Sequence, residues 1–368
     1  MAEVLSEARE IRRRPRSAGR APASVRDAWL PTAGVALLFL AHLAHGALIT
    51  DAAMVMGAAG ALLLGACLLH AKVRDDLLRL NGLEWPGLLF AVVLLVALWT
   101  LTPWTPGGPH GVWAYVGVSP GASTIDRSTT IIEIIKLLGL ASLFLVGAAT
   151  GARDDRARLA VQLTLAAGMV FGVWAFIGSV TGMIAQTQGH RLEAHFVNPN
   201  TAGTFFAVLL LLAIGELQRR LRQRRSEQDL SLVILLGAAV LTFAVCLLDT
   251  ASRGAVLSFL GAAAVFVLVQ LACGAIKLSR AVLIALVGLL LLLVVVWFAG
   301  DQLIDRFFKT GDAAIVRTAI WKEHWTAFLD APLFGYGLGT AETVNKTLMN
   351  AANTPVLWSI KAYARASA

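Results

Sequence analysis

Apolar residues along the chain gather in long blocks that are separated by short polar connectors. Each block holds about 20 residues, which at about 1.5 Å per helical residue matches a hydrocarbon core of about 30 Å. Lipid also requires that backbone polar groups be satisfied within a segment, which favours helices over open strands. The pattern therefore predicts an all-α polytopic membrane protein with nine transmembrane helices. The predicted spans are residues 30–48, 52–70, 85–102, 129–149, 158–180, 200–216, 230–248, 254–273 and 281–299.

Composition agrees with this pattern and excludes a soluble fold. Hydrophobic residues make up 57% of the chain and charged residues only 15%, against about 25% charged in soluble domains. The net charge of +8 could suit nucleic acid, but the basic residues lie in the connectors between apolar blocks, as membrane topology requires. We therefore expect no nucleic-acid partner. The three cysteines lie in or beside apolar blocks and are expected to be small buried hydrophobes: Cys67, Cys246 and Cys273.

The charge of the connectors predicts the orientation of the chain. Every second connector is basic, beginning with the Arg-rich N-terminal tail, so these connectors belong on the cytoplasmic side. The N-terminus is then cytoplasmic, and everything after the ninth span is periplasmic, in a bacterial inner membrane. Four parts follow from this: a disordered basic tail (1–28), a helical membrane domain (29–299), a periplasmic amphipathic-helix segment (300–340) and an atypical tail (341–368).

Charged residues are sparse inside the predicted spans, and two of them stand three positions apart. Glu133 and Lys136 lie near the start of the fourth span, one helical step from each other. A mutually satisfied ion pair is the preferred interpretation, and a functional role is the alternative.

Three arginines fall on the predicted outer side, where basic residues are otherwise avoided. The first, Arg191, precedes the turn and helix-start signal Asn198-Pro199-Asn200. This segment is either a capped helix start with solvated flanks or a helix N-terminus that presents amides and an arginine to an anion. His190, Glu193 and His195 share no single helical face, so we expect no metal site there.

The second outer arginine, Arg253, lies in the sequence Asp249-Thr-Ala-Ser252-Arg253-Gly254 at the end of the seventh span. An arginine at a span boundary commonly extends its guanidinium to the interface. Small neighbours let other groups approach closely, and a planar guanidinium matches phosphate oxygens. The local sequence therefore favours a phosphate-binding role.

The third outer arginine, Arg317, opens a stretch with apolar residues at helical spacing. This stretch predicts an amphipathic helix at the outer membrane interface, which ends at Pro332. A glycine run follows, but it neither follows a buried strand nor opens a βαβ unit, so it is not a dinucleotide-binding motif. The apolar residues of the stretch are Trp321, Trp325, Phe328 and Leu329.

Together these three blocks resemble the O-antigen ligase and polymerase superfamily of bacterial envelope glycan enzymes, the Wzy-C type. Arg191 to Asn200 is similar to the family's Arg-x-x-Gly-x-Phe-x-Asn-Pro-Asn element, with Ala194 and His195 in place of the usual small residues. The segment around Ser252, Arg253 and Gly254 resembles the family's Ser-Arg-Gly turn. The third block resembles its Arg-x-x-x-Trp … Pro-Leu-x-Gly-x-Gly-x-Gly stretch through Arg317, Trp321, Pro332, Leu333, Gly335, Gly337 and Gly339.

The resemblance implies glycan transfer on the periplasmic face. Members of the family move a glycan from a polyprenyl diphosphate carrier to an acceptor sugar or protein side chain, without a cofactor or an essential metal. Carried over by motif, Arg191, Arg253 and Arg317 would bind the diphosphate. The acceptor, and the choice between ligase, polymerase and protein glycosylation, stay open.

The chain departs from the family where a base is expected. The family's catalytic histidine follows the glycine run, whereas no histidine follows His324 in this chain. Two explanations are open: a shortened gene product, which would be inactive, or a divergent member in which His195 or His324 replaces the base. A non-enzymatic transporter or translocator of lipid-linked glycans is the alternative function; it predicts internal repeats and site residues in mid-span.

Overall fold

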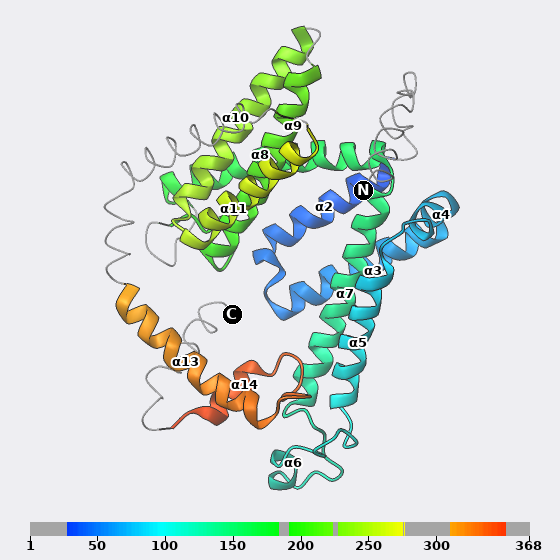
Figure 1. Cartoon of the computed structure of the whole chain (residues 1–368), viewed down its shortest axis with the longest axis vertical. Helices are drawn as coiled ribbons and strands as arrows, with labels where there is room; N and C mark the ends of the chain where they lie inside the picture. The colour runs from blue at the N-terminus through cyan, green and yellow to red at the C-terminus, as the bar shows by residue number, and fades with distance from the viewer. Residues whose placement is uncertain (1–27, 184–190, 224–226, 275, 277–309, 351–368) are drawn as a thin grey trace.

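The protein is described by a computed structural model that covers residues 28–183, 191–223, 227–274, 276 and 310–350. Secondary structure in these residues is entirely helical, which confirms the predicted all-α class. The helices (Figure 1) are α2 (Trp29–Leu43), η2 (His45–Ala47), α3 (Thr50–Leu69), α4 (Ala71–Leu78), α5 (Glu84–Thr100), α6 (Val112–Tyr115), α7 (Arg127–Gly151), α8 (Asp154–Thr181), α9 (Pro199–Gln223), α10 (Glu227–Asp249), α11 (Arg253–Ala272), α13 (Thr310–Asp330) and α14 (Ala341–Leu348).

Six of the described helices are long and apolar enough to cross a membrane: α3, α7, α8, α9, α10 and α11. The chain is thus a multi-pass membrane protein. Two shorter apolar helices, α2 and α5, coincide with the first and third predicted spans. The ninth predicted span, residues 281–299, lies outside the described residues, so the total of nine stays a prediction.

Several boundaries and elements differ from the sequence prediction. Helix α2 ends at Leu43 rather than at residue 48, because His45, Gly46 and Ala47 take positive φ angles that cannot continue an α-helix. The polar connectors also contain helices that apolar periodicity did not indicate, namely α4, α6 and α14. Of the cysteines, Cys67 and Cys246 are buried as expected, whereas Cys273 is exposed at the end of α11.

The largest apolar core joins α8, α9 and α10 to the segment that precedes α9. Phe206 and Phe243 are fully buried in it, and Leu192 and Phe196 enter it from that segment. An aromatic cluster extends this core to α2, where the Phe39 ring meets the Phe171 ring with centroids 6.2 Å apart. This core fixes the segment before α9 against the helix ends.

Helices α3 and α7 cross closely at two glycines. A Cβ atom on Gly139 would stand 2.6 Å from the Cα of Gly57, so neither position tolerates a side chain without movement. Just beyond the C-terminal end of α7, the Arg156 guanidinium of α8 donates to the Asp76 carboxylate of α4 at 2.7 Å. The ion pair ties the α4 connector to the start of α8.

The C-terminal described segment covers the start of α7. Figure 1 shows α14 beside the lower end of α7, with α6 and the loop around it below. Ile125 of the loop between α5 and α7, Ala327 of α13 and Val344 of α14 form a small apolar core. The amide of Ile125 also donates to the carbonyl of Tyr336 at 2.9 Å. We call this loop, residues 101–126, the outer loop.

The Asp126 carboxylate caps the N-terminus of α7. It accepts the Thr129 amide at 3.0 Å and the Ser128 hydroxyl at 2.7 Å. These hydrogen bonds, the one from the Thr129 amide foremost, lower the pKa of Asp126 below its usual value. The capped, charged form therefore supports the outer end of α7 at neutral pH.

Asp126→Ala is expected to destabilise the protein by about 1 kcal/mol at pH 7, because the cap is lost. Because the pKa of Asp126 is lower in the folded than in the unfolded protein, its carboxylate stabilises the fold at pH values above the unfolded-state pKa. This stabilisation is lost as the pH falls through the folded-state pKa. The difference between wild type and Asp126→Ala should therefore shrink below about pH 4. Tryptophan-fluorescence melting in detergent measures it. Asp126→Asn, which can still cap the helix, serves as the control; an Asp126→Ala deficit that is equal at pH 7 and pH 3 would contradict the assignment.

Candidate functional site

Two sequence motifs that lie about sixty residues apart meet at one end of the helical bundle. The Arg191 side chain donates from Nε to the carbonyl of Thr250 at 2.9 Å, and its Nη2 lies 3.3 Å from Oδ1 of Asn200 and 3.5 Å from the carbonyl of Ala251. The amide of Leu192 donates to the carbonyl of Asp249 at 3.0 Å. The structure thus joins the first arginine to the turn that carries the second.

The start of α9 follows the sequence prediction closely. The helix begins at Pro199, which fits its first turn because proline has no amide hydrogen to leave unpaired. The Asn198 side chain accepts the Asn200 amide at 2.8 Å and so caps the helix. Asn198 and Asn200 are exposed. The motif therefore presents a capped helix N-terminus beside the Arg191 guanidinium, as an anion site would require.

The turn between α10 and α11 places Arg253 as the first residue of α11. Ser252 caps that helix, since its hydroxyl accepts the Ala255 amide at 3.3 Å. Gly203 of α9 lets the turn approach: a Cβ atom there would stand 2.9 Å from the Thr250 hydroxyl oxygen and 2.8 Å from the Ala255 Cβ. Gly203 was not predicted as a site residue, because its close neighbours are distant in sequence.

His195, four residues after Arg191, faces a second histidine. Its ring stacks on the His45 ring with centroids 5.7 Å apart, and its ring meets Trp174 edge-on at 5.0 Å. His45 belongs to η2, after the first apolar helix. Gly46 of the same turn packs against Phe196, which a side chain at that position would overlap. His45 was missed in the sequence analysis because it fell inside a predicted span.

Non-glycine residues with positive φ gather at the same place. Within the part of the chain that the structure describes, there are five: His45, Ala47, Ala194, His195 and Ala251. They lie in η2, in the segment before α9 and in the turn before α11. A left-handed backbone conformation is unfavourable for such residues, so it persists only where the packing around them holds it in place. Such positions are most common at functional sites. The three turns are therefore held in a specific arrangement.

The third motif takes a different place in the fold. Arg317 and Trp321 lie in α13, and the Arg317 side chain is outside the described part of the structure. His324 is also on α13, with Nδ1 2.9 Å from the carbonyl of Ile320 one turn earlier. Gly335, Gly337 and Gly339 follow in the segment that covers α7. The described contacts thus bring Arg191 to the Arg253 turn and bring the glycine run to the start of α7.

The glycine run fits closely against α7. All three glycines have positive φ, and a side chain at Gly337 would overlap Thr124, while one at Gly339 would overlap Glu133. Glu133 also accepts from the Lys136 ammonium at 2.7 Å, which confirms the predicted ion pair. Glu133 of this pair therefore lies directly against Gly339.

A helix is observed over the first part of the third motif as α13, which ends at Asp330, and its amphipathic character stays a prediction. Its aromatic residues Trp321, Trp325 and Phe328 are exposed, and the Trp325 and Phe328 rings stack with centroids 5.2 Å apart. Ala327 on the opposite face is buried against the outer loop. The helix thus packs on the protein through Ala327 and leaves its aromatic side chains exposed. We predict that α13 lies at the membrane interface, where these aromatic side chains would face lipid.

Comparison with known proteins agrees with the motifs. Neither a search of curated proteins nor a search of solved structures found a significant match. Residues 237–366 match the family model Wzy_C, described as O-antigen ligase. The matched region includes Ser252, Arg253 and the whole third motif, and it continues through most of the segment that the sequence analysis set apart as an atypical tail. Over this region the chain is therefore similar to the O-antigen ligase (Wzy_C) family, which agrees with the resemblance that its motifs carry.

Proposed function

We propose that this membrane protein transfers a glycan from a polyprenyl diphosphate carrier to an acceptor on the periplasmic face. The family whose model matches residues 237–366 points to glycosyl transfer of the ligase or polymerase type. The observation that carries the proposal is the contact of Arg191 with the turn before Arg253. It joins two motif blocks that are distant in sequence at one end of the bundle.

In this proposal the arginines hold the diphosphate of the donor. Each guanidinium is a fixed positive charge whose planar fork matches phosphate oxygens. When the glycosidic bond to the carrier breaks, negative charge develops on the departing diphosphate. Charges already in place stabilise that state more than water can, because they need no reorganisation. Arg317 is proposed as a third diphosphate ligand from its motif alone, and Ser252, Asn198 and Asn200 shape the site through the caps described above.

The acceptor hydroxyl needs a base, and His195 is the better placed of the two candidates. It shares a short segment with Arg191 and lies beside an exposed His45. An imidazole nitrogen can accept a proton, which suits removal of a proton from a sugar hydroxyl as the new bond forms. No cofactor or metal enters this scheme. The acceptor itself is left open among lipid-linked sugar, glycan and protein side chain.

The proposed setting is the bacterial inner membrane, with a cytoplasmic N-terminus and a periplasmic C-terminal segment. The basic connectors support this orientation, since Arg74, Arg156 and Arg222 all belong to the opposite end of the helices from Arg191. The same arrangement places the candidate residues at helix ends. A transporter would instead carry its site at broken helices near mid-span, so glycan transfer is the better supported function.

Arg253→Ala is expected to lower glycan transfer by about 10²–10³-fold, the typical cost of losing one preorganised electrostatic contact. The assay uses the full chain in proteoliposomes, with a polyprenyl diphosphate-linked glycan as the donor. Three acceptors are tested in separate reactions: lipopolysaccharide core, a second glycan and an unfolded protein. Release of polyprenyl diphosphate reports the reaction for every acceptor. Arg253→Lys should recover part of the rate, because the charge remains without the planar fork.

Arg74→Ala is the matched control, because Arg74 is a half-exposed arginine of the α4 connector at the opposite end of the helices. It should transfer glycan at the wild-type rate. Equal rates for Arg253→Ala and wild type would refute the role of Arg253. A wild-type chain that binds the donor but releases no polyprenyl diphosphate with any acceptor would refute the proposed reaction.

A further inference from the structure

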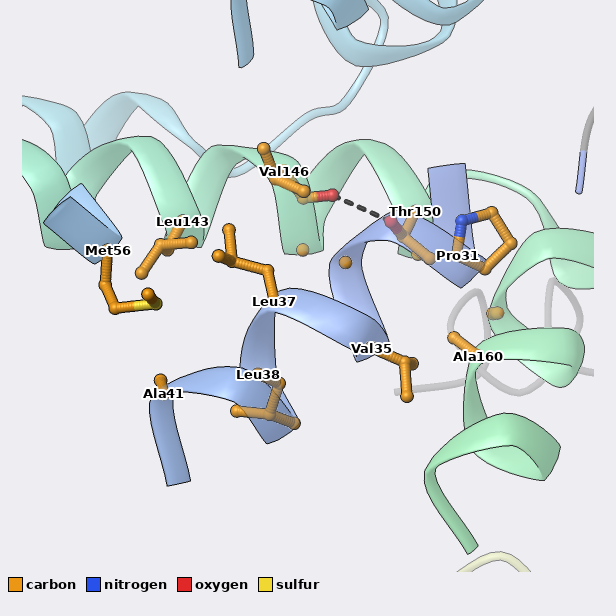
Figure 2. A pocket seen from close by; sticks show the side chains of 14 residues that line it. Pro31, Val35, Leu37, Leu38, Ala41, Met56, Leu143, Val146, Thr150 and Ala160 are labelled. Atoms are coloured by element: carbon orange, nitrogen blue, oxygen red, sulfur yellow. Dashed lines mark hydrogen bonds between the residues drawn. The ribbon is translucent and has the colours of Figure 1, made fainter. Parts of the chain in front are cut away.

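A sugar binds through its hydroxyl groups, and the apolar groove along α2 has little to offer them. The groove has a volume of about 420 Å³ and runs between α2, α3, α7 and α8 (Figure 2). Thr150 carries the one polar side chain among its fourteen lining residues, and its hydroxyl already donates to the carbonyl of Val146 at 2.8 Å. Side chains that recognise a sugar must therefore lie elsewhere in the fold.

Asp249 places a carboxylate at the end of the bundle where the arginine-bearing segments meet. It is the last residue of α10 and is half-buried. The carboxylate accepts the Ser179 hydroxyl of α8 at 3.3 Å, which is long for a bond between two oxygens. Within the part of the chain that the structure describes, this is the one hydrogen bond to that carboxylate. A carboxylate has about four acceptor positions, so most of them stay open.

The position of this carboxylate makes its negative charge costly. The C-terminal end of a helix carries a partial negative charge, so an anion is unfavourable there. Helix α10 is also one of the helices long and apolar enough to cross a membrane, and ionisable groups on such helices are expensive and commonly functional. One long hydrogen bond from the neutral Ser179 hydroxyl does not offset this cost. The charge of Asp249 therefore calls for a role beyond the contact with α8.

The backbone around Asp249 joins the two arginine-bearing segments. Its carbonyl accepts the Leu192 amide at 3.0 Å, and the next carbonyl, that of Thr250, accepts Nε of Arg191 at 2.9 Å. Arg253 begins α11 only four residues after Asp249. The carboxylate is thus carried by the same turn that receives the first arginine and leads to the second.

The turn after Asp249 is held firmly by its own hydrogen bonds. Thr250 is fully buried, and its hydroxyl donates to the carbonyl of Leu247 at 2.6 Å. The amide of Ala251, a residue with positive φ, donates to the carbonyl of Leu248 at 2.8 Å. A side chain on a rigid turn loses little conformational freedom when a ligand binds, so Asp249 is well placed to contact one.

The charge of Asp249 restricts the groups that it can contact. A carboxylate repels the phosphates of the proposed donor, whereas hydroxyl groups donate to it in charge-assisted hydrogen bonds. The Ser179 hydroxyl already makes a contact of this chemical kind. In a glycan linked to a diphosphate, the first sugar is joined to the phosphate through one oxygen atom. Its hydroxyl groups therefore lie next to the phosphates.

We propose that the Asp249 carboxylate accepts hydrogen bonds from hydroxyl groups of the sugar that is linked directly to the donor diphosphate. This inference rests on the proposed function for the identity of the donor. The arginines then hold the phosphates while Asp249 holds the first sugar from the neighbouring position. Asp249 is thus a specificity-determining residue, which distinguishes a sugar-bearing carrier from the bare diphosphate that remains after transfer.

Asp249→Asn tests the proposal, because asparagine keeps the size of the side chain and can still accept the Ser179 hydroxyl but carries no charge. The full chain in detergent is titrated with undecaprenyl diphosphate that carries N-acetylglucosamine, galactose or no sugar, and bound probe is counted by native mass spectrometry. Wild type should bind a sugar-bearing probe more tightly than the bare one. Asp249→Asn should weaken binding of that sugar-bearing probe about tenfold, as expected when hydrogen bonds to a charged group are lost. It should not weaken binding of the bare probe.

Two further variants serve as controls. Asp75→Asn removes a half-exposed carboxylate of α4 at the opposite end of the helices and should bind all probes as wild type does. Ser179→Ala removes the contact with α8 but leaves the Asp249 carboxylate, so it should keep the preference for the sugar. A loss in Ser179→Ala as large as that in Asp249→Asn would show that the contact with α8 matters rather than the charge, and would overturn the proposal.

Three other outcomes bear on the proposal and on the function beneath it. Equal binding of all three probes by wild type would overturn the sugar contact, and so would equal losses of bare and sugar-bearing probes in Asp249→Asn. Arg253→Ala should weaken all three probes alike, because it removes a phosphate contact. A wild-type chain whose preference for the sugar requires Asp249, but which releases no polyprenyl diphosphate with any acceptor, would refute the proposed function and leave the sugar site standing.

Discussion

Gly337→Ala is expected to detach the glycine run from α7 and to destabilise the protein by more than about 2 kcal/mol. Two costs add up. The φ of Gly337 is +105°, which an alanine adopts only with strain, and its methyl group would overlap the buried Thr124 side chain. Thr124 cannot move away easily, because its hydroxyl is 2.7 Å from that of Thr130.

Hydrogen exchange measures this effect at a defined atom. The amide of Ile125 donates to Tyr336 next to the substituted position, so peptides that contain Ile125 should lose protection in Gly337→Ala. Gly335→Ala is the control: its φ of +59° is also positive, but a Cβ atom there meets nothing within 4 Å. Unchanged protection at Ile125 in Gly337→Ala, or an equal loss in Gly335→Ala, would show that the contact with Thr124 does not hold the segment.

Local patterns in the sequence predicted the elements whose causes are local. The long apolar blocks predicted the long apolar helices, because the thickness of the bilayer sets the length of both. Asn198 and Pro199 marked the start of α9, since capping and the missing proline amide act within one turn. The ion pair of Glu133 and Lys136 followed from helical spacing. Each of these inferences needed no knowledge of distant residues.

Features that depend on long-range packing were not predictable in the same way. Nothing in the neighbourhood of Arg191 indicates that its guanidinium meets the carbonyl of Thr250. Helix α14 has no apolar block of span length and is fixed by contacts of Val344 with the outer loop. The left-handed turns at His45 and Ala251 likewise depend on the helices around them. The motifs therefore predicted which residues belong to the site, and the fold shows that Arg191 meets the turn before Arg253.

His195 and His324 show how the fold separates two candidates that the sequence left equal. His195 lies at positive φ between Arg191 and the start of α9, stacked on His45. His324 points its Nδ1 at a carbonyl of its own helix, in the segment that also carries the exposed tryptophans. The proposed base is therefore His195, and the two histidines serve as test and control for each other.

His195→Asn is expected to lower the rate of glycan transfer by about 10²–10⁴-fold, the range typical for loss of a general base. Asparagine is the suitable replacement because it tolerates left-handed backbone but cannot take up a proton near neutrality. The reaction is followed as release of polyprenyl diphosphate with saturating donor, so that a change in donor binding does not mimic the loss. His324→Asn should stay within about twofold of wild type.

The pH dependence distinguishes a base from a positioning residue. With His195 as the base, the dependence of the rate on pH should differ between wild type and the residual activity of His195→Asn. A residue that only orients the segment would lower the rate and leave the profile unchanged. A wild-type rate in His195→Asn would refute the role of His195, and a loss confined to His324→Asn would move the base to α13.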